Sequence, residues 1–198
     1  MKIVVVGASG ILGRAVVKEL GTDHEVVEAS RSNPKHPVDI GDDGSVRALF
    51  DDVGPVDAII STTGEVHFGP LKDMTAEQFN KGLQNKLLGQ VRLALVGQHY
   101  LKPGGSITLT TGINTWEAIR DGANVMSVNA AVEGFVRAAA TELKDRRINA
   151  VSPTLLTESV GAYGAWFPGF ESVPAARVAL AFRRSVEGVQ TGRVFKVW

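Results

Sequence analysis

Three glycines lie close together near the start of the chain, in the segment Gly7-Ala8-Ser9-Gly10-Ile11-Leu12-Gly13. The apolar residues Ile3 to Val6 before them predict a strand buried on both faces, and Ile11 to Leu20 predicts a helix. A glycine-rich turn between a strand and a helix lets backbone N–H groups approach a pyrophosphate. This context predicts a dinucleotide site, and a plain strand–helix turn is the alternative. The residues predicted to hold the dinucleotide in this segment are Gly7, Ser9, Gly10, Ile11 and Leu12.

A basic side chain follows the second predicted strand, Glu25 to Ser30. Arg31 lies 18 residues beyond Gly13, near the place where a dinucleotide fold reads the adenosine ribose. A guanidinium pairs well with the 2′-phosphate of NADP, and the hydroxyls of Ser30 and Ser32 add donors. Glu28 is the rival reader and would favour NAD, but it precedes the end of the strand. We therefore predict NADP rather than NAD; in the alternative, Arg31 is a solvated surface residue.

Predicted helices and strands alternate along the chain, which favours a parallel sheet with helices on both faces. We predict one domain over residues 1–198, an α/β fold of the Rossmann-like, doubly wound type with three layers, α/β/α. Ser45 is the expected N-cap of its helix, and Thr75 opens a long helix with a capping box. Only Ser32 to Pro37 separate the second strand from Val38-Asp39-Ile40, too few residues for a helical crossover, so we expect a reduced third strand. The other predicted elements are the helices Ser45–Val53, Thr75–Leu101, Ala123–Lys144 and one within Val173–Val186 that begins at Pro174, and the strands Val56–Ile60, Ser106–Thr111, Ile148–Ser152 and Val194–Trp198.

The composition excludes several kinds of chemistry. The 21 basic and 21 acidic side chains cancel, so no bulk charge attracts nucleic acid or an anionic membrane. The chain has no cysteine, which excludes thiolate catalysis and disulfides, and its four histidines match no metal-ligand spacing. The apolar stretch near the start is too short to span a bilayer and does not have the pattern of a signal peptide. We expect no metal, no nucleic acid and no membrane, and a cytoplasmic protein.

Four further segments resemble the short-chain dehydrogenase/reductase family over essentially the whole chain. They are Val38-Asp39-Ile40, Ser61-Thr62-Thr63-Gly64, Asn149-Ala150-Val151-Ser152-Pro153 followed by Thr157, and Thr191-Gly192. The resemblance implies hydride transfer between NADP and a small carbonyl or alcohol substrate. It adds Asp39, Ile40, Ser61, Thr62, Thr63, Gly64, Pro153, Leu155 and Thr157 to the cofactor residues. It also implies a homodimer or homotetramer that pairs the helices Thr75–Leu101 and Ala123–Lys144.

The catalytic motif departs from the family pattern. The positions of the family's tyrosine and lysine fall on Val125 and Asn129, so this chain is similar to a small atypical member without that pair. The family's serine falls at Thr111 or Gly112, and a threonine hydroxyl can still bond a carbonyl. The family's asparagine falls at Lys86 or Asn85. We hypothesise that Lys86 binds the cofactor ribose and acts on the reacting oxygen, with its pKa lowered by partial burial; a snorkelling surface lysine is the alternative.

Weaker candidates lie in loops that follow strand ends. His67, Glu117 and Tyr163 are polar, and Trp116, Trp166, Phe167 and Phe170 are expected to form an apolar substrate wall or to bury surface between subunits. Residues 155–173 resemble the family's substrate-covering loop. Because the usual proton donor is missing, the alternative to an oxidoreductase is a non-catalytic NADP-binding redox sensor or regulator, or a relic in which the nucleotide only stabilises the fold.

Overall fold

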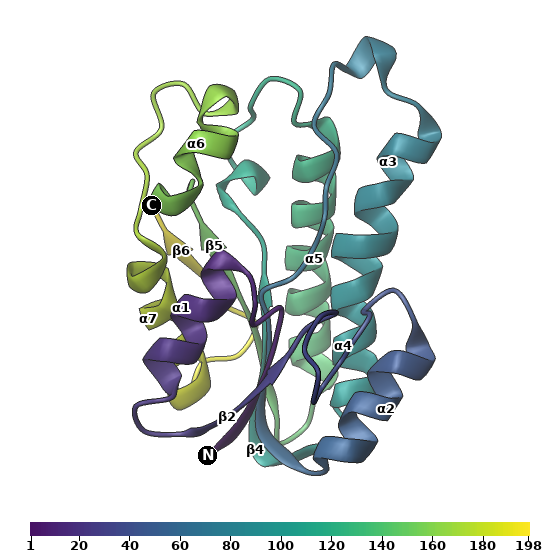
Figure 1. Cartoon of the computed structure of the whole chain (residues 1–198), viewed down its shortest axis with the longest axis vertical. Coiled ribbons are helices and arrows are strands. Elements are labelled where there is room, and N and C mark those ends of the chain that lie inside the picture. The colour runs from purple at the N-terminus through teal and green to yellow at the C-terminus, as the bar shows by residue number, and fades with distance from the viewer.

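A six-stranded parallel sheet forms the centre of the computed structural model, which describes all residues from 1 to 198. Figure 1 shows α1 and α7 on one face of the sheet and α2, α4 and α5 on the other. The predicted three-layer α/β/α fold is therefore confirmed. The strand order is β2-β1-β3-β4-β5-β6, with every neighbouring pair parallel. The strands are β1 (Lys2–Val6), β2 (Glu25–Ala29), β3 (Val56–Ser61), β4 (Leu101–Thr110), β5 (Arg147–Pro153) and β6 (Val194–Val197).

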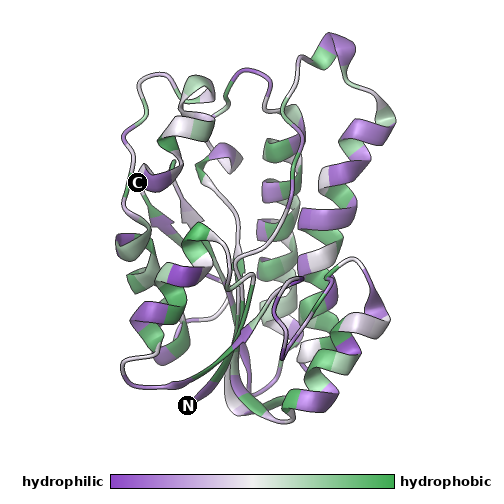
Figure 2. Ribbon diagram, viewed as in Figure 1, coloured by the Kyte–Doolittle hydropathy of each residue, from purple (hydrophilic) through white to green (hydrophobic).

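The strand β1 shows why an unbroken apolar run suits a central parallel strand. Val4 and Val6 belong to the core on the side of α2, α4 and α5, whereas Ile3 and Val5 belong to the core under α1 and α7. Successive side chains point to opposite faces, so both must be apolar. In Figure 2 the helix α5 carries many hydrophobic residues, whereas the projecting α3 is mainly hydrophilic. The helices are α1 (Ile11–Leu20), α2 (Asp43–Val53), α3 (Ala76–Gly82), α4 (Gly89–Gly97), α5 (Ala123–Glu142), α6 (Val160–Tyr163) and α7 (Ala175–Glu187).

The helix α1 has the predicted bounds and lies unusually close to the turn that precedes it. A Cβ at Gly13 would be 2.0 Å from the carbonyl oxygen of Gly7 and 2.8 Å from the Cα of Ala8. Only glycine fits at this contact. Leu12, Val16 and Leu20 then point into the core, as the helical spacing predicts.

The predicted N-cap Ser45 is wrong. Asp42 caps α2, because its Oδ1 accepts the N–H of Gly44, and the helix begins at Asp43. Ser45 lies inside the helix, and its hydroxyl accepts the N–H of Asp39. The reduced third strand is confirmed: between β2 and α2 the chain forms only an isolated parallel bridge, from Ser30 to Pro37.

The predicted single helix from Thr75 to Leu101 is divided. Thr75 forms the expected capping box with Gln78 and opens α3, but a π-helical segment, η2 (Leu83–Leu88), separates α3 from α4. The helix ends at Gly97 with a turn closed by the Tyr100 N–H and the Gly97 carbonyl. Placing Leu101 in the helix is therefore wrong: it begins β4 beside Val56 of β3.

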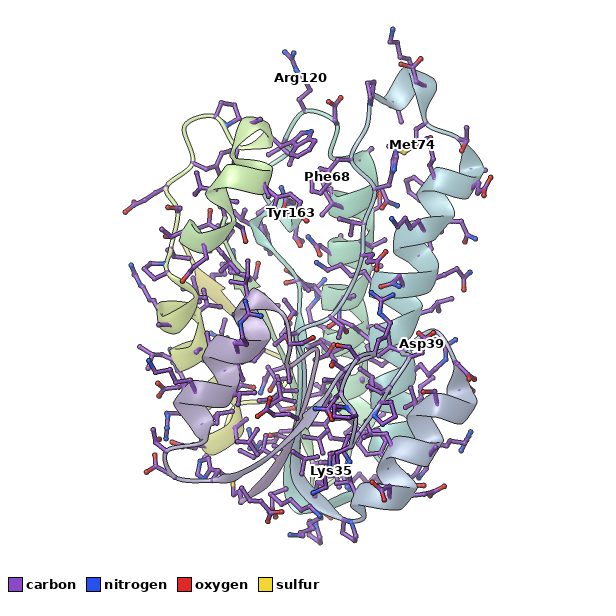
Figure 3. The ribbon with its side chains drawn as sticks, in the orientation of Figure 1. Lys35, Asp39, Phe68, Met74, Arg120 and Tyr163 are labelled. Atoms are coloured by element: carbon purple, nitrogen blue, oxygen red, sulfur yellow. The ribbon has the colours of Figure 1, made fainter.

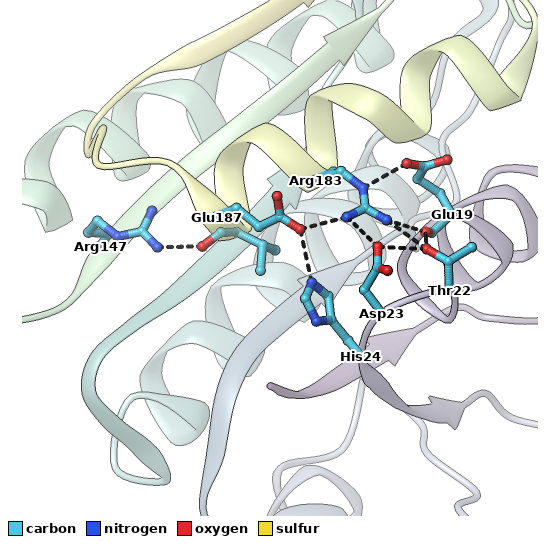
Figure 4. A network of polar contacts seen from close by, with 8 residues as sticks. Glu19, Thr22, Asp23, His24, Arg147, Arg183 and Glu187 are labelled. Atoms are coloured by element: carbon cyan, nitrogen blue, oxygen red, sulfur yellow. Dashed lines mark hydrogen bonds and ion pairs between the residues drawn. The ribbon is translucent and has the colours of Figure 1, made fainter.

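The amino edge of the sheet is held by a polar network around Arg183 of α7 (Figure 4). Its guanidinium pairs with Glu19 at 2.7 Å, Glu187 at 2.7 Å and Asp23 at 3.0 Å. These pairs raise the pKa of Arg183. Hydrogen bonds from Thr22, the largest cause, and from Arg183 lower the pKa of Asp23. The network joins α7 to the end of α1, at the edge opposite the carboxyl ends of the strands. None of the helices is long and apolar enough to cross a membrane.

Candidate functional site

A cleft of about 440 Å³ opens at the carboxyl ends of β1, β2 and β3. Open parallel sheets bind their ligands at this edge. Eleven of the 15 residues around the cleft are predicted cofactor residues: Gly7, Ser9, Gly10, Ser30, Arg31, Ser32, Asp39, Ile40, Thr62, Thr63 and Gly64. The other four are Val6, Val38, Glu65 and Asn85.

Hydrogen bonds tie the end of β3 to the glycine turn. The hydroxyl of Thr62 lies 3.1 Å from the carbonyl oxygens of both Val6 and Gly7, and the hydroxyls of Ser61 and Thr63 are 2.8 Å apart. Ile11 and Leu12 stand in the first turn of α1, outside the cleft lining, with Leu12 in the core. The backbone of the glycine turn thus lines the cleft at the place where a phosphate would bind.

Arg31 reaches across the cleft from the end of β2. Its Nη2 donates to Glu65 Oε1 at 2.8 Å, and Lys81 Nζ lies 3.5 Å from the second carboxylate oxygen. The hydrogen bond from Arg31 is the largest cause of a lowered pKa at Glu65. The rival reader Glu28 does not line the cleft. No sequence pattern indicated Glu65, because it lies 34 residues from Arg31.

Lys86 stands in the π-helical segment, a geometry that often occurs at functional sites. Its side chain lies over Gly64 at the end of the cleft: a Cβ on Gly64 would be 2.5 Å from Lys86 Cγ. The side chain is half-buried, and its ammonium makes no hydrogen bond or ion pair with the protein. Desolvation lowers the pKa of Lys86 to about 8. These observations support the interpretation that the Lys86 ammonium is available to bind a ligand.

Gln90 is a positioning residue that the sequence did not indicate. Its buried amide donates to the carbonyl oxygens of Thr110 at 2.9 Å and Lys86 at 3.2 Å, and accepts the N–H of Thr110 at 2.8 Å. Three bonds from one side chain therefore join the π-helical segment to the end of β4. A glutamine on a buried helix face was the available signal, since buried amides need partners.

The helix α5 contains neither tyrosine nor lysine. Val125 and Asn129 are buried on it, and neither polar atom of the Asn129 amide has a partner. Thr111 lies just beyond β4, and its hydroxyl donates to Oε1 of the buried Glu133 at 3.1 Å. Of the two tyrosines in the chain, Tyr100 bonds Asp51 near the amino edge of the sheet.

The other tyrosine, Tyr163, stacks in an aromatic cluster above the sheet. Its ring centroid lies 5.9 Å from that of Phe68 and 6.2 Å from that of Trp166, and the Phe68 and Trp166 rings are 4.9 Å apart. Figure 3 shows Phe68 and Tyr163 close together between α6 and the loop that follows β3. Two segments far apart in sequence thus meet over the carboxyl edge of the sheet.

The remaining predicted residues divide among several places. Pro153 ends β5 and is followed by Leu155, which packs against Ile113 and Phe167. Thr157 donates its N–H to Val173, beside the bridge from Leu156 to Val173 that closes the loop of residues 155–173 at its base. The other candidates do not line the cofactor cleft. Phe170 packs edge-on against Phe167, and the ring of Trp116 lies 3.8 Å from the Lys196 ammonium. Glu117 lines a separate cavity, and the backbone N–H of His67 donates to Asn124.

Comparison with known proteins decides the family. The family model described as Enoyl-(Acyl carrier protein) reductase matches residues 6–190. The chain belongs to the short-chain dehydrogenase/reductase family. Among curated relatives, the versicolorin reductase stcU of Emericella nidulans is 31% identical over 74% of this chain and 61% of its own length. The hydroxynaphthalene reductase arp2 of Aspergillus fumigatus is 28% identical over 72% of this chain and 56% of its own.

Solved structures agree with the fold. The protein lin1944 from Listeria innocua is 44% identical, and the alignment covers all of both chains with a TM-score of 0.98. A small-chain dehydrogenase solved in complex with NADPH is 29% identical, with a TM-score of 0.89 over all of this chain and 96% of that chain. The matched curated relatives are longer, so this chain spans only about three-fifths of their length or less.

Proposed function

We propose that the protein is an NADP-dependent oxidoreductase that transfers a hydride between the cofactor and a small carbonyl or alcohol. The observation that carries the proposal is the cleft itself. The glycine turn and Arg31 line it, and the side chain of Lys86 packs against Gly64, another of its lining residues. The NADPH complex of a 29% identical relative of the same fold supports the choice of cofactor. Reductases among the curated relatives favour the direction of carbonyl reduction.

The residues present fit a dinucleotide along the whole groove. Gly7, Ser9, Gly10, Ile11 and Leu12 would hold the pyrophosphate through backbone N–H groups and the start of α1. Ser30, Arg31 and Ser32 would take the 2′-phosphate, with Asp39 and Ile40 at the adenine and Ser61, Thr62, Thr63 and Gly64 along the ribose and phosphate chain. Pro153, Leu155 and Thr157 would lie at the nicotinamide end. When bound, NADPH supplies the hydride.

We propose that Lys86 donates the proton to the substrate oxygen and stabilises the negative charge that develops on it. The carbon atoms Cβ, Cγ and Cδ of the Lys86 side chain lie over Gly64, and its ammonium would contact the nicotinamide ribose and the substrate oxygen. With a pKa of about 8, it remains mostly protonated at neutral pH and can donate a proton to the developing alkoxide. Thr111 would bond the same oxygen once its hydroxyl leaves Glu133.

The second candidate is a protein that binds NADP without turnover, as a redox sensor or regulator. The absence of tyrosine and lysine from α5 favours it. Steady oxidation of NADPH with a panel of carbonyl compounds distinguishes the two: turnover supports the oxidoreductase, and tight binding without turnover supports the sensor.

Replacing Arg31 with alanine tests the cofactor assignment. Charge-assisted bonds to a phosphate contribute enough that Arg31→Ala is expected to weaken NADPH binding about 10- to 100-fold, while NADH binding stays unchanged. Quenching of tryptophan fluorescence measures both constants. Arg120→Ala is the matched control, since Arg120 points into solvent at the top of the molecule (Figure 3). Equal losses for NADPH and NADH would contradict the assignment.

The substrate class follows from the aromatic cluster and the relatives. Tyr163 and Trp166 lie on the loop of residues 155–173 that we propose covers the substrate, and Phe68, on the loop after β3, packs against both. We propose that these rings offer apolar faces to the substrate at the nicotinamide end. The names of the curated relatives specify hydroxynaphthalene and versicolorin substrates. We therefore place aromatic ketones first in the carbonyl panel.

The helices α4 and α5 carry the proposed subunit contact. A cavity of about 270 Å³ between them is lined mostly by apolar side chains, and Leu95 at its rim is 53% exposed. We propose that a second copy covers this face, giving a homodimer or homotetramer. Leu95→Glu is expected to yield monomers in sedimentation velocity, whereas Leu180→Glu, an equally exposed leucine on α7, leaves the assembly intact. A monomeric wild-type protein would rule the contact out.

A further inference from the structure

The ion pair between Arg31 and Glu65 spans the proposed cofactor cleft. The two residues follow different strands, β2 and β3, and both line the cleft. Their side chains meet at 2.8 Å, with exposed fractions of 70% and 43%. The guanidinium that would receive a phosphate therefore already binds an anion supplied by the protein.

Glu65 is held at this place by its own backbone. Its N–H donates to Asn85 Oδ1 at 2.8 Å, and Gly64 before it has a φ of +131° that directs the chain across the cleft. A glutamate side chain is already anionic at neutral pH, and the hydrogen bond from Arg31 lowers the pKa of Glu65 further. A phosphate that approaches Arg31 meets a fixed negative charge at the same point.

Lys81 provides a second cation for Glu65. Its ammonium lies 3.5 Å from Oε2, whereas Arg31 bonds Oε1. If Arg31 turns to a phosphate, Glu65 keeps Lys81 as its partner. The exchange thus leaves no carboxylate unpaired.

We propose that Glu65 is an internal competitor for the 2′-phosphate of NADP and thereby sets how strongly the protein prefers NADP over NAD. This inference rests on the proposed cofactor. An exposed ion pair contributes up to about fivefold to an equilibrium constant, so a phosphate with nearly two charges displaces it, at the cost of that factor in affinity. A cofactor without the 2′-phosphate leaves the pair in place and is unaffected by it.

The test is Glu65→Gln, which keeps the shape of the side chain and removes its charge. We expect NADPH and adenosine 2′,5′-bisphosphate to bind about two- to fivefold more tightly, with NADH and adenosine 5′-monophosphate unchanged, in titrations at low and high salt. The gain should shrink as salt increases. Asp73→Asn removes one exposed acidic charge outside the cleft and should change none of the four constants.

Lys81→Met supplies a second variant. It leaves Glu65 with Arg31 alone, so NADPH should bind about two- to fivefold more weakly, and the loss should vanish in the Glu65→Gln background. Unchanged or weaker NADPH binding in Glu65→Gln, or equal changes for NADPH and NADH, would overturn the inference. A wild-type protein that does not bind NADPH more tightly than NADH would instead overturn the proposed cofactor.

Discussion

Replacing Lys86 with methionine is expected to lower kcat for NADPH-dependent carbonyl reduction by about 10²- to 10⁴-fold, the usual contribution of a general acid. The reason is that the side chain of Lys86 packs over Gly64, which lines the cleft, while its ammonium pairs with no carboxylate. Lys86→Arg keeps the charge and should retain cofactor affinity while it loses most of the proton transfer. Lys72→Met, at an exposed lysine outside the cleft, is the matched control.

The pH dependence of the same reaction gives a second measurement. Burial disfavours the charged form, so the pKa of Lys86 falls to about 8. The protonated acid is present below that pH and is lost above it, so kcat for reduction should fall as pH rises through about 8. Wild-type turnover that stays level from pH 7 to 9, or a Lys86→Met variant with full activity, would exclude Lys86 as the acid.

The thermal stability of Lys86→Met distinguishes a catalytic role of Lys86 from a structural one. The folded protein disfavours the Lys86 ammonium relative to the unfolded chain, and this penalty is present in full below pH 8 and disappears as pH rises toward the ordinary lysine pKa. Lys86→Met removes the penalty, so its Tm at pH 7 should be higher than that of the wild type. Loss of activity with a gain in Tm is the expected combination.

Replacing Gly13 with alanine is expected to lower the free energy of unfolding by more than about 3 kcal/mol. The added Cβ would lie 2.0 Å from the Gly7 carbonyl oxygen and 2.8 Å from Ala8 Cα, and both are backbone atoms of a turn that cannot yield as a flexible side chain does. Urea denaturation measures the loss.

Two other glycines provide controls for that experiment. Gly161 lies in α6 with no atom within 4 Å of an added Cβ, so Gly161→Ala should leave stability unchanged or raise it by up to about 1 kcal/mol. At Gly10 the nearest atom would be 3.3 Å away, so alanine should preserve folding but weaken NADPH binding. A stable Gly13→Ala protein would refute the close contact between α1 and the turn.

The sequence was most informative where one local pattern determines the structure. The apolar run from Ile3 to Val6 and the capping box at Thr75 predicted their elements correctly. The N-cap of α2 was missed because Asp42 and Ser45 are both good capping residues only three positions apart. Long-range pairings left no local signal: beside the π-helical segment, Gln90 bonds Thr110, a residue 20 positions away.

In the candidate site, too, local features could be predicted from the sequence and long-range contacts could not. The glycine turn that lines the cleft could be predicted, because it is contiguous in sequence. The carboxylate of Glu65 could not, because its meeting with Arg31 exists only once β2 and β3 lie on either side of β1. The placement of Lys86 rested on a family resemblance, and its chemical role stays a prediction until the variants are measured.

The reduced third strand leaves β2 at the border of the sheet, where unpaired backbone groups invite pairing with another chain. The border strand is short, five residues, and two of them, Glu25 and Glu28, are exposed acids. Pro34, Lys35 and Pro37 follow it, and proline lacks the N–H that a neighbouring strand would need. At the opposite border, β6 has four residues and an exposed lysine, Lys196. Short strands, exposed charges and prolines thus disfavour edge-to-edge pairing at both borders of the sheet.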